Sequence, residues 1–257
     1  MVIVLRKMPM GLSAIAEARM TWCEWPGAFI GLEVLEKYGC RMATGLGLTL
    51  YLVAVSFALG LVIGLALAVA KLRAGRIPSA IIHGYTTFFR GTPLLVQLFL
   101  IYYGLGSIRP FWQEIGLWWF FREPVYCCLL AFTLNTAAYQ AEIFRGALQS
   151  LPTGQAEAAR ALGMRPLPIF LKIEMPLALI VALRPLGNEL IVMIKASALA
   201  SLVTLFDLMG ATKLAFARSF DLSIYFVAAL IYLSMVEIIR RLWDAMETRL
   251  TRHLVLR

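Results

Sequence analysis

The chain has 257 residues, of which 61% are hydrophobic and 15% are charged, and its mean hydropathy is +0.79. A soluble domain is about half apolar and about one quarter charged, so this composition excludes an ordinary soluble protein. A net charge of +9 would indicate nucleic acid binding in a soluble chain. Here the charges stand between long apolar runs. They therefore indicate orientation in a lipid bilayer, and we expect no nucleic acid partner.

Five apolar segments predict five membrane-spanning helices, because a helix needs about 20 apolar residues to cross a bilayer. The expected fold class is all-α integral membrane. We predict a lead-in over residues 1–41, a membrane domain over 42–241 and a cytoplasmic tail over 242–257. The predicted spans cover residues 42–70, 79–108, 124–146, 176–195 and 222–240.

The lead-in fits this pattern poorly. Met1–Leu5 with Arg6 and Lys7 resembles the start of a signal peptide, but no apolar core of about 7–15 residues follows. One hypothesis places the true start at Met20, which leaves a short lead-in to the first span. N-terminal sequencing that found Met1 or any of residues 2–19 in the mature protein would contradict it.

Two features of the first and second spans predict local geometry. Gly60 and Gly64 form a small-xxx-small pair that lets another helix approach closely, although glycines facing lipid are an equally open alternative. Arg90 and Gly91 predict a helix bend at the inner membrane face, because glycine frees the backbone and Pro93 sets the next turn.

Basic residues predict the orientation of the chain. The connections over 71–91 and 142–175 and the tail after the last span are rich in Lys and Arg, so the positive-inside rule places them in the cytoplasm. The N-terminus then lies outside and the C-terminus inside. The connection over 106–123 is outside, and its six Phe and Trp side chains suit an interfacial aromatic belt.

The segment after the third span predicts a short amphipathic helix. Pro152 stands at a typical helix start and Gly163 at a typical stop, with alanines, Glu157 and Arg160 between them. We expect Glu157 in the first turn, where the helix dipole favours an anion. A stiff helix between two spans could couple them to a partner protein. A solvated surface helix is the alternative.

Four motifs in order resemble the permease subunits of ABC importers for polar amino acids, and this resemblance covers about residues 45–241. The first is the family's EAA motif, formed by Glu157, Ala158, Ala159, Gly163, Ile173 and Pro176. The other segments are Phe89–Gln97, Leu134–Gly146 and Pro185–Glu189 with Lys195–Ser197.

The EAA motif departs from the family pattern at two positions. Met175 stands where the family usually has Leu, and Ile180 stands where it often has Arg. Arg184, one turn further on, is the candidate replacement for that arginine.

The resemblance implies a type I importer permease fold, the MetI-like fold, in the bacterial inner membrane. It is strongest with M-type subunits of the histidine/lysine-arginine-ornithine and opine branch, which implies a polar, basic substrate. It also implies that a cytoplasmic loop docks into an ATPase subunit. The residues expected to form this ATPase-coupling loop are Glu157, Ala158, Ala159, Arg160 and Gly163.

The implied complex has two ATPase subunits, a second permease that is either a related chain or another copy, and a periplasmic substrate-binding protein. The chain has no G-x-x-x-x-G-K-[ST] motif. We therefore expect ATP and Mg on the partner ATPase and no cofactor on this chain. We predict no catalytic set and no metal site.

Charged and polar side chains inside spans are costly and are functional candidates by default. Glu189 could hold a cationic substrate, but an ion pair with Arg184 or Lys195 is the alternative. Glu142 lies at the cytoplasmic end of its span, where solvation alone could satisfy it. The candidates for the substrate path are Asn135, Tyr139, Glu142, Asn188 and Glu189.

Rival functions come from other classes. A proton-coupled secondary carrier usually shows internal repeats of spans, and none is evident here. A membrane hydrolase would need a nucleophile with a histidine partner, which Ser197 and Ser201 lack. A permease-like scaffold without transport stays open.

Overall fold

A computed structural model describes residues 33–252 of the chain, and all regular elements of the described part are helices. The question of the start at Met20 lies outside these residues. In chain order, the helices are α3 (Glu33–Arg73), α4 (Arg76–Gly91), α5 (Leu94–Phe99), the π-helix η2 (Leu100–Leu105), α6 (Arg109–Glu114), α7 (Trp118–Phe121), α8 (Pro124–Gln149), α9 (Thr153–Ala161), α10 (Pro166–Ile169), the π-helix η3 (Phe170–Glu174), α11 (Met175–Ala196), the 3₁₀-helix η4 (Ser197–Val203), α12 (Leu208–Ser219) and α13 (Ser223–Thr251).

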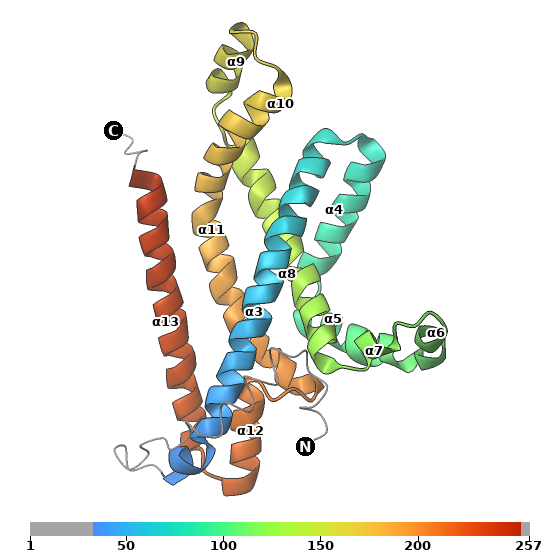
Figure 1. Cartoon of the computed structure of the whole chain (residues 1–257), viewed down its shortest axis with the longest axis vertical. Coiled ribbons are helices and arrows are strands. Elements are labelled where there is room, and N and C mark those ends of the chain that lie inside the picture. Colours follow the sequence, from blue (N-terminus) through green and yellow to red (C-terminus); the bar gives the residue numbers. More distant parts are fainter. Residues whose placement is uncertain (1–32, 253–257) are drawn as a thin grey trace.

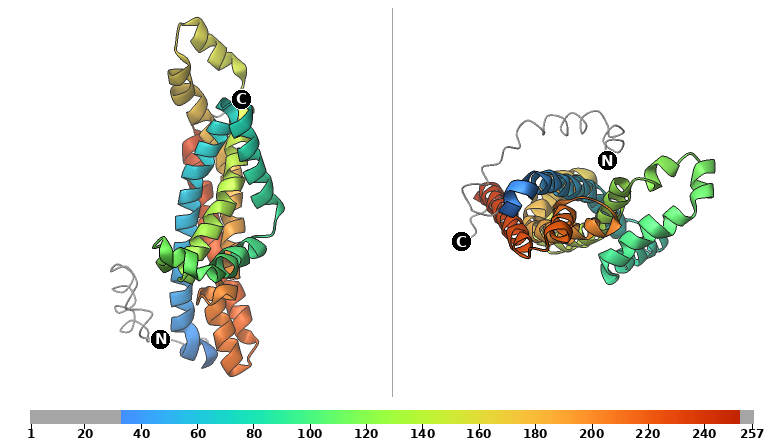
Figure 2. Two further views of the ribbon diagram at one scale, coloured as in Figure 1. Left: turned by 90° about the vertical axis from the view of Figure 1, so that its right-hand side faces the viewer. Right: turned by 90° about the horizontal axis from the view of Figure 1, so that it is seen from below.

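The long helices α3, α8, α11 and α13 lie side by side in an elongated bundle (Figures 1 and 2). Helix α9 stands out beyond one end of this bundle, and α12 lies at the other end (Figure 1). The start of α3 lies at the α12 end, whereas α13 finishes toward the α9 end. The bundle therefore has two distinct ends, and the coupling-loop candidate belongs to one of them.

Within residues 33–252, three helical segments are long and apolar enough to cross a bilayer, namely Lys37–Arg73, Pro166–Val203 and Ser223–Thr251. The bent pair Arg76–Gly91 and Leu94–Leu105 makes a fourth if it crosses as one span. Helix α8 fails this test, although its 26 residues correspond to about 39 Å. It carries Thr, Asn and Gln side chains that lower its hydropathy, and most of these are buried inside the bundle.

The second predicted span is a broken helix and not a continuous one over 79–108. Helices α4 and α5 meet at an angle of 105°. Thr92 is extended, with φ −114° and ψ 146°, because the ring of Pro93 disfavours helical backbone in the residue before it. The bend predicted at Arg90 and Gly91 is confirmed. Gly91 ends the 16-residue helix α4, about 22 Å from the turn between α3 and α4. The location of this bend at the inner membrane face stays a prediction.

The close approach of α3 and α8 depends on the glycine pair of the first span. A Cβ atom at Gly60 would lie 2.6 Å from Cγ2 of Thr136, and one at Gly64 would lie 3.0 Å from the backbone nitrogen of Ala141. The first distance is shorter than real Cβ contacts allow, and the second is tighter than nearly all of them, so a side chain at either position would force its neighbours to shift. The two glycines therefore face α8, which decides between the alternatives in favour of helix contact.

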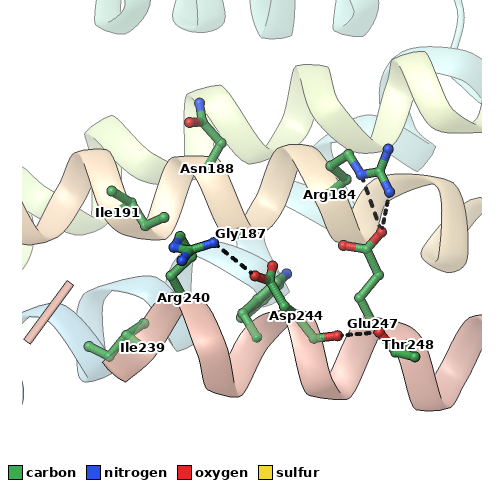
Figure 3. A pocket seen from close by; sticks show the side chains of 10 residues that line it. Arg184, Gly187, Asn188, Ile191, Ile239, Arg240, Asp244, Glu247 and Thr248 are labelled. Carbon is green, nitrogen blue, oxygen red and sulfur yellow. Dashed lines mark hydrogen bonds and ion pairs between the residues drawn. The ribbon is translucent and has the colours of Figure 1, made fainter. Parts of the chain in front are cut away.

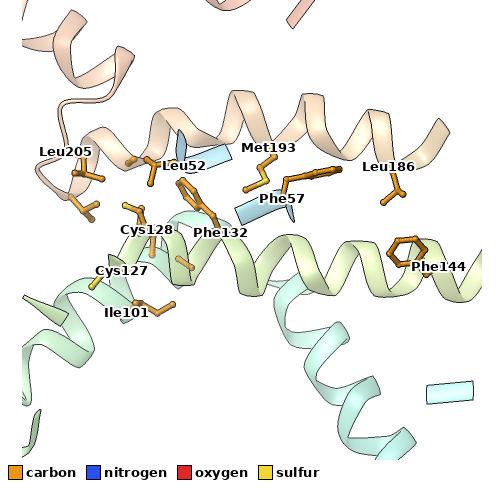
Figure 4. Packing of buried hydrophobic residues seen from close by; sticks show 14 of the residues in the cluster. Leu52, Phe57, Ile101, Cys127, Cys128, Phe132, Phe144, Leu186, Met193 and Leu205 are labelled. Atoms are coloured by element: carbon orange, nitrogen blue, oxygen red, sulfur yellow. The ribbon is translucent and has the colours of Figure 1, made fainter. Parts of the chain in front are cut away.

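The main core lies where α3, α8 and α11 meet (Figure 4). Phe132 of α8 is 1% exposed and packs with Leu52 and Phe57 of α3 and with Met193 of α11. Ile101 of the broken second span joins the same cluster. Because Ile101 follows the break after Gly91, this packing holds the broken helix against α8, which carries the polar residue Asn135.

Candidate functional site

Helix α9 ends as its sequence predicts. Gly163 has φ +79°, a backbone conformation that favours glycine. The Met164 N–H donates to the Ala159 carbonyl over 3.1 Å, and the Gly163 N–H donates to the Arg160 carbonyl over 2.9 Å. This is the Schellman arrangement, which satisfies the last carbonyls of a helix. Glycine at this position therefore shapes the tip of the loop.

One face of α9 is exposed, and the other packs on the α10–η3 segment that follows it, so that α9 and this segment form a helical hairpin. Glu157, Ala158, Arg160 and Gly163 are exposed, whereas Ala156 and Ala159 are buried. The two buried alanines pack against Ile169, with Met164 and Ile173 beside them. Ala159 is therefore turned toward the hairpin and away from any partner that could approach the exposed face.

The expectation that Glu157 lies in the first turn of α9 is wrong. The helix begins at Thr153, and its first turn contains no acidic residue. Pro152 acts as the N-cap, where the sequence predicts the start, and residues 153–156 precede Glu157 in the helix, so Glu157 lies in the second turn. The helix dipole is therefore not the factor that places this carboxylate, and Glu157 is an exposed charge on the middle of the helix.

A cavity of about 370 Å³ opens beside the break between α4 and α5. It is lined by Arg90 and Thr92 at the break, by Asn135 and Tyr139 of α8 and by Glu189 of α11. Three of the five substrate-path candidates therefore meet in one cavity, with an arginine that the sequence had assigned only to a bend. The cavity holds both a cationic and an anionic side chain.

Glu189 is 9% exposed and contacts α8 rather than a cation on its own helix. Its Oε1 accepts a hydrogen bond from the Thr136 hydroxyl over 3.1 Å. Arg184 pairs instead with Glu247 of α13 over 2.9 Å. Among residues 33–252, no ion pair joins Glu189 to Arg184 or Lys195, so the alternative interpretation of Glu189 is not what the structure contains.

Asn135 holds the broken helix together. Its Nδ2 donates to the Phe89 carbonyl over 3.1 Å and to Oε1 of Gln97 over 3.0 Å. Gln97 in turn donates to the Phe89 and Thr92 carbonyls over 2.9 and 3.0 Å. Irregular backbone inside a membrane needs such partners, because no water is available there. The two amides supply them at the break.

Tyr139 contacts the same break from the next turn of α8. Its hydroxyl donates to the Arg90 carbonyl over 3.4 Å, and the guanidinium carbon of Arg90 lies 5.4 Å from the ring centroid. Tyr139 therefore lies between the bend and the cavity, and it places the Arg90 side chain over an aromatic face.

Glu142 lies outside the cavity. Its carboxylate pairs with Lys71 at the end of α3 over 2.5 Å and with Arg145 one turn along α8 over 2.7 Å. Only 13% of the Glu142 side chain is exposed, so an ion-pair network satisfies this acid and solvation does not. Glu142 joins two helices at the α9 end of the bundle.

Asn188 lines a separate cavity of about 450 Å³ between α11 and α13 (Figure 3). Arg184 and Glu247 form an ion pair in this cavity, and Arg240 pairs with Asp244 over 3.3 Å. Asn188 and Glu189 are neighbours in sequence but face different cavities. The two candidates therefore do not form one site.

Sequence reasoning missed two contributors to the cavity beside the break. Arg90 was interpreted only as part of a bend, and Thr136 was not singled out although it contacts Glu189. Their positions in the sequence, next to residues of the resembling motifs, could have indicated a role at the site. Arg90 precedes Gly91 in a motif-bearing segment, and Thr136 follows Asn135 in another.

Residues 60–252 match the sequence model of the family described as the binding-protein-dependent transport system inner membrane component. The chain belongs to this family. It is therefore a permease subunit of the inner membrane and not an enzyme. Permeases of this kind work with a separate ATPase and a substrate-binding protein.

Named relatives cover most of the chain. The nopaline transport system permease protein of Agrobacterium fabrum is 40% identical over 86% of this chain and 92% of its own length. The histidine/lysine/arginine/ornithine transport system permease protein of Escherichia coli K12 is 36% identical over 86% and 97%. A crystal structure of an amino acid ABC transporter with histidines superimposes with a TM-score of 0.73 at 32% identity, covering 83% and 95% of the two chains.

These matches confirm the resemblance to ABC importer permeases of the opine and histidine/lysine-arginine-ornithine branch. They also confirm the all-helical, MetI-like permease fold. The proton-coupled carrier receives no support from them.

Proposed function

We propose that this chain is the membrane-spanning subunit of an ATP-driven importer for a basic amino acid or opine. The observation that carries the proposal is helix α9, which projects from the bundle and exposes Glu157, Ala158, Arg160 and Gly163 at one end. The substrate class is supported by relatives whose names specify nopaline and histidine, lysine, arginine and ornithine.

The proposed topology has five spans, with the N-terminus outside and the C-terminus inside. The spans are α3, the bent pair of α4 with α5 and η2, α8, α11 and α13. Opposite directions of successive helices along the bundle support this count (Figure 1). Lys71 and Arg73 end α3 near α9, which agrees with a cytoplasmic location of that end by the positive-inside rule.

The proposed coupling element is the exposed face of α9. Binding of ATP would close a pair of ATPase subunits, and the docked helices would move with them. Glu157 offers a carboxylate to a basic group of the ATPase, and such charge-assisted contacts are strong and directional. Ala159 contributes from the opposite face, where it fixes α9 on Ile169. Two nucleotide-binding subunits, carrying ATP and Mg, and two permease chains complete the proposed assembly.

The proposed substrate path passes the cavity beside the helix break. Glu189 and Arg90 give this cavity an anionic and a cationic side chain, which suits a polar molecule with several charges. Asn135 and Tyr139 shape its wall from α8. Asn188 and Glu142 were candidates for the same path, but they face the α11–α13 cavity and the α3–α8 ion pair respectively, so we propose no substrate contact for them.

The test is ATPase stimulation in a reconstituted system. The chain is purified with its neighbouring ATPase and binding protein, and single amino acids or opines are added. We expect arginine, lysine, histidine, ornithine or an opine to stimulate hydrolysis. Glu157→Lys should abolish the stimulation, whereas Glu114→Lys on α6, which lies to the side of the bundle and away from α9, should leave it unchanged. Failure of any ATPase to associate with the chain would exclude the importer function.

A further inference from the structure

The last turn of α3 contacts two different parts of the chain through two basic residues. Lys71 and Arg73 are two positions apart, so they point about 200° apart around the helix. Lys71 pairs with Glu142 of α8. The Arg73 side chain stacks on Phe170 of η3, with its guanidinium carbon 3.7 Å from the centroid of the Phe170 ring. The end of α3 therefore bridges α8 and η3.

Phe170 stands at the junction between the projecting hairpin and α11. It is the first residue of η3, a π-helical turn that leads directly into α11, and it is 7% exposed. A π-helical turn is rare and often marks a functional position. Phe170 therefore lies where the chain passes from α10 into α11.

A short series of packed side chains joins α9 to the Arg73 contact. Ala156 and Ala159 of α9 pack on Ile169, which is 2% exposed, and Ile173 lies beside them. Ile169 is the neighbour of Phe170 in the sequence. Because packed interiors are dense and hardly compressible, a displacement of α9 has to move this turn as well.

We propose that Arg73 is a positioning residue that carries motion of α9 to the first span through Phe170. The inference rests on the proposed role of α9 as the ATPase-coupling helix. When α9 moves, η3 moves with it, and the stacked guanidinium draws the end of α3 along. The Lys71–Glu142 pair then passes the movement to α8, whose Thr136 and Tyr139 border the substrate cavity.

A cation stacked on a ring suits this role. Its attraction depends on distance to the ring face but tolerates sliding across it, so two helices can stay in contact while they tilt. Arginine is the better residue for such stacking because its guanidinium is planar and weakly hydrated. Lysine at position 73 should therefore preserve the contact only in part.

The test uses the whole reconstituted complex with ATPase and binding protein. The variants are Arg73→Gln, Arg73→Lys, Phe170→Leu and Phe170→Tyr, with Arg76→Gln as the control that removes an exposed basic residue from the same turn region. Transport per ATP hydrolysed, substrate-free ATPase activity and complex yield are measured for each.

We expect Arg73→Gln and Phe170→Leu to lower transport per ATP by about fivefold, the factor that a contact of this class is worth. Substrate-free ATPase activity and complex yield should stay unchanged. Phe170→Tyr and Arg76→Gln should resemble the wild type, and Arg73→Lys should lie between. The double variant Arg73→Gln with Phe170→Leu should be no worse than either single variant, because both remove one contact.

Three results would overturn the proposal. They are a wild-type ratio of transport to ATP hydrolysis in Arg73→Gln, an equal loss of this ratio in Arg76→Gln, and losses of this ratio that multiply in the double variant.

Glu157→Lys separates this proposal from the proposed function. If Glu157→Lys blocks coupling while Arg73→Gln does not, only the role of Arg73 is wrong. If Glu157→Lys has no effect, α9 is not the coupling helix, and the inference about Arg73 falls with it.

Discussion

The Asn135 side chain donates a hydrogen bond to the Phe89 carbonyl over 3.1 Å and so ties α8 to the break between α4 and α5. The break turns the chain by 105° and leaves carbonyls without helical partners. Asn135 and Gln97 together satisfy these carbonyls. A side chain first chosen as a substrate contact therefore has a structural task at the same place.

Asn135→Leu should destabilise the subunit. The substitution leaves the Phe89 carbonyl with one donor fewer and removes the partner of the Gln97 side-chain oxygen, and unsatisfied groups of this kind cost about 1–3 kcal/mol each. Thermal unfolding of the purified complex in detergent should show a lower midpoint. Asn188→Leu is the matched control, because Asn188 is exposed and makes no such contact with the break. Equal midpoints for the two variants would contradict the structural role of Asn135 at the helix break.

Gly64→Ala should separate α3 from α8. The added Cβ would lie 2.9 Å from Cβ of Gln140 and 3.1 Å from the Ala137 carbonyl oxygen, so α3 or α8 would have to shift. Overpacking of this kind costs about 1–3 kcal/mol. Gly146→Ala, near the C-terminal end of α8, is the control, since nothing lies within 4 Å of its added Cβ. Gly146→Ala should be neutral or slightly stabilising in the same unfolding measurement.

Local signals predicted the coupling helix well. Pro152 and Gly163 bound α9 as expected, because an N-terminal proline and a C-terminal glycine act through their own backbone preferences. The position of Glu157 within the helix was wrong by about one turn. The helix start itself agrees with the prediction, and residues 153–156 between Pro152 and Glu157 are enough to place Glu157 in the second turn.

Contacts between distant segments were not predictable in the same way. The role of Asn135 depends on a carbonyl 46 residues away that is free only because the chain breaks at Pro93. The pairing of Glu142 with Lys71 depends on how α3 and α8 are staggered. Asn188 and Glu189 are adjacent, but a helix turns about 100° per residue, so the packing of α11 decides which cavity each one faces.

Asp207 should make stability depend on pH. It lies between α11 and α13, is fully buried, and caps α12 by accepting a hydrogen bond from the Gly210 N–H over 2.9 Å. Burial raises the pKa of its carboxyl from 3.8 to about 6, against the opposing effects of the Gly210 N–H and of Lys213. The folded state therefore favours the protonated acid. This contribution is complete below about pH 4 and is lost as pH rises through about 6.

The measurement is the thermal midpoint of the purified complex between pH 4 and 7, compared with Asp207→Asn. Asparagine caps a helix about as well as aspartate and carries no charge. The variant should therefore lose the pH-dependent part that the wild type shows between about pH 4 and 6. An unchanged pH profile in the variant would mean that another group controls the dependence.

Glu189→Gln should separate the folding role of this residue from its transport role. The amide oxygen of glutamine can still accept the Thr136 hydrogen bond, which spans 3.1 Å in the structure, so the thermal midpoint should change little. The cavity beside the helix break would lose its carboxylate and keep the Arg90 guanidinium. Because a cationic side chain gains about 1.5–3 kcal/mol from a charged hydrogen-bond partner, uptake of a basic amino acid should fall about tenfold or more.

Thr136→Val is the companion variant. It removes the Thr136 hydroxyl but keeps the Glu189 carboxylate, so it should lower stability more than uptake. Normal basic amino acid uptake by a correctly assembled Glu189→Gln complex would remove Glu189 from the substrate path and leave it as a helix-packing residue.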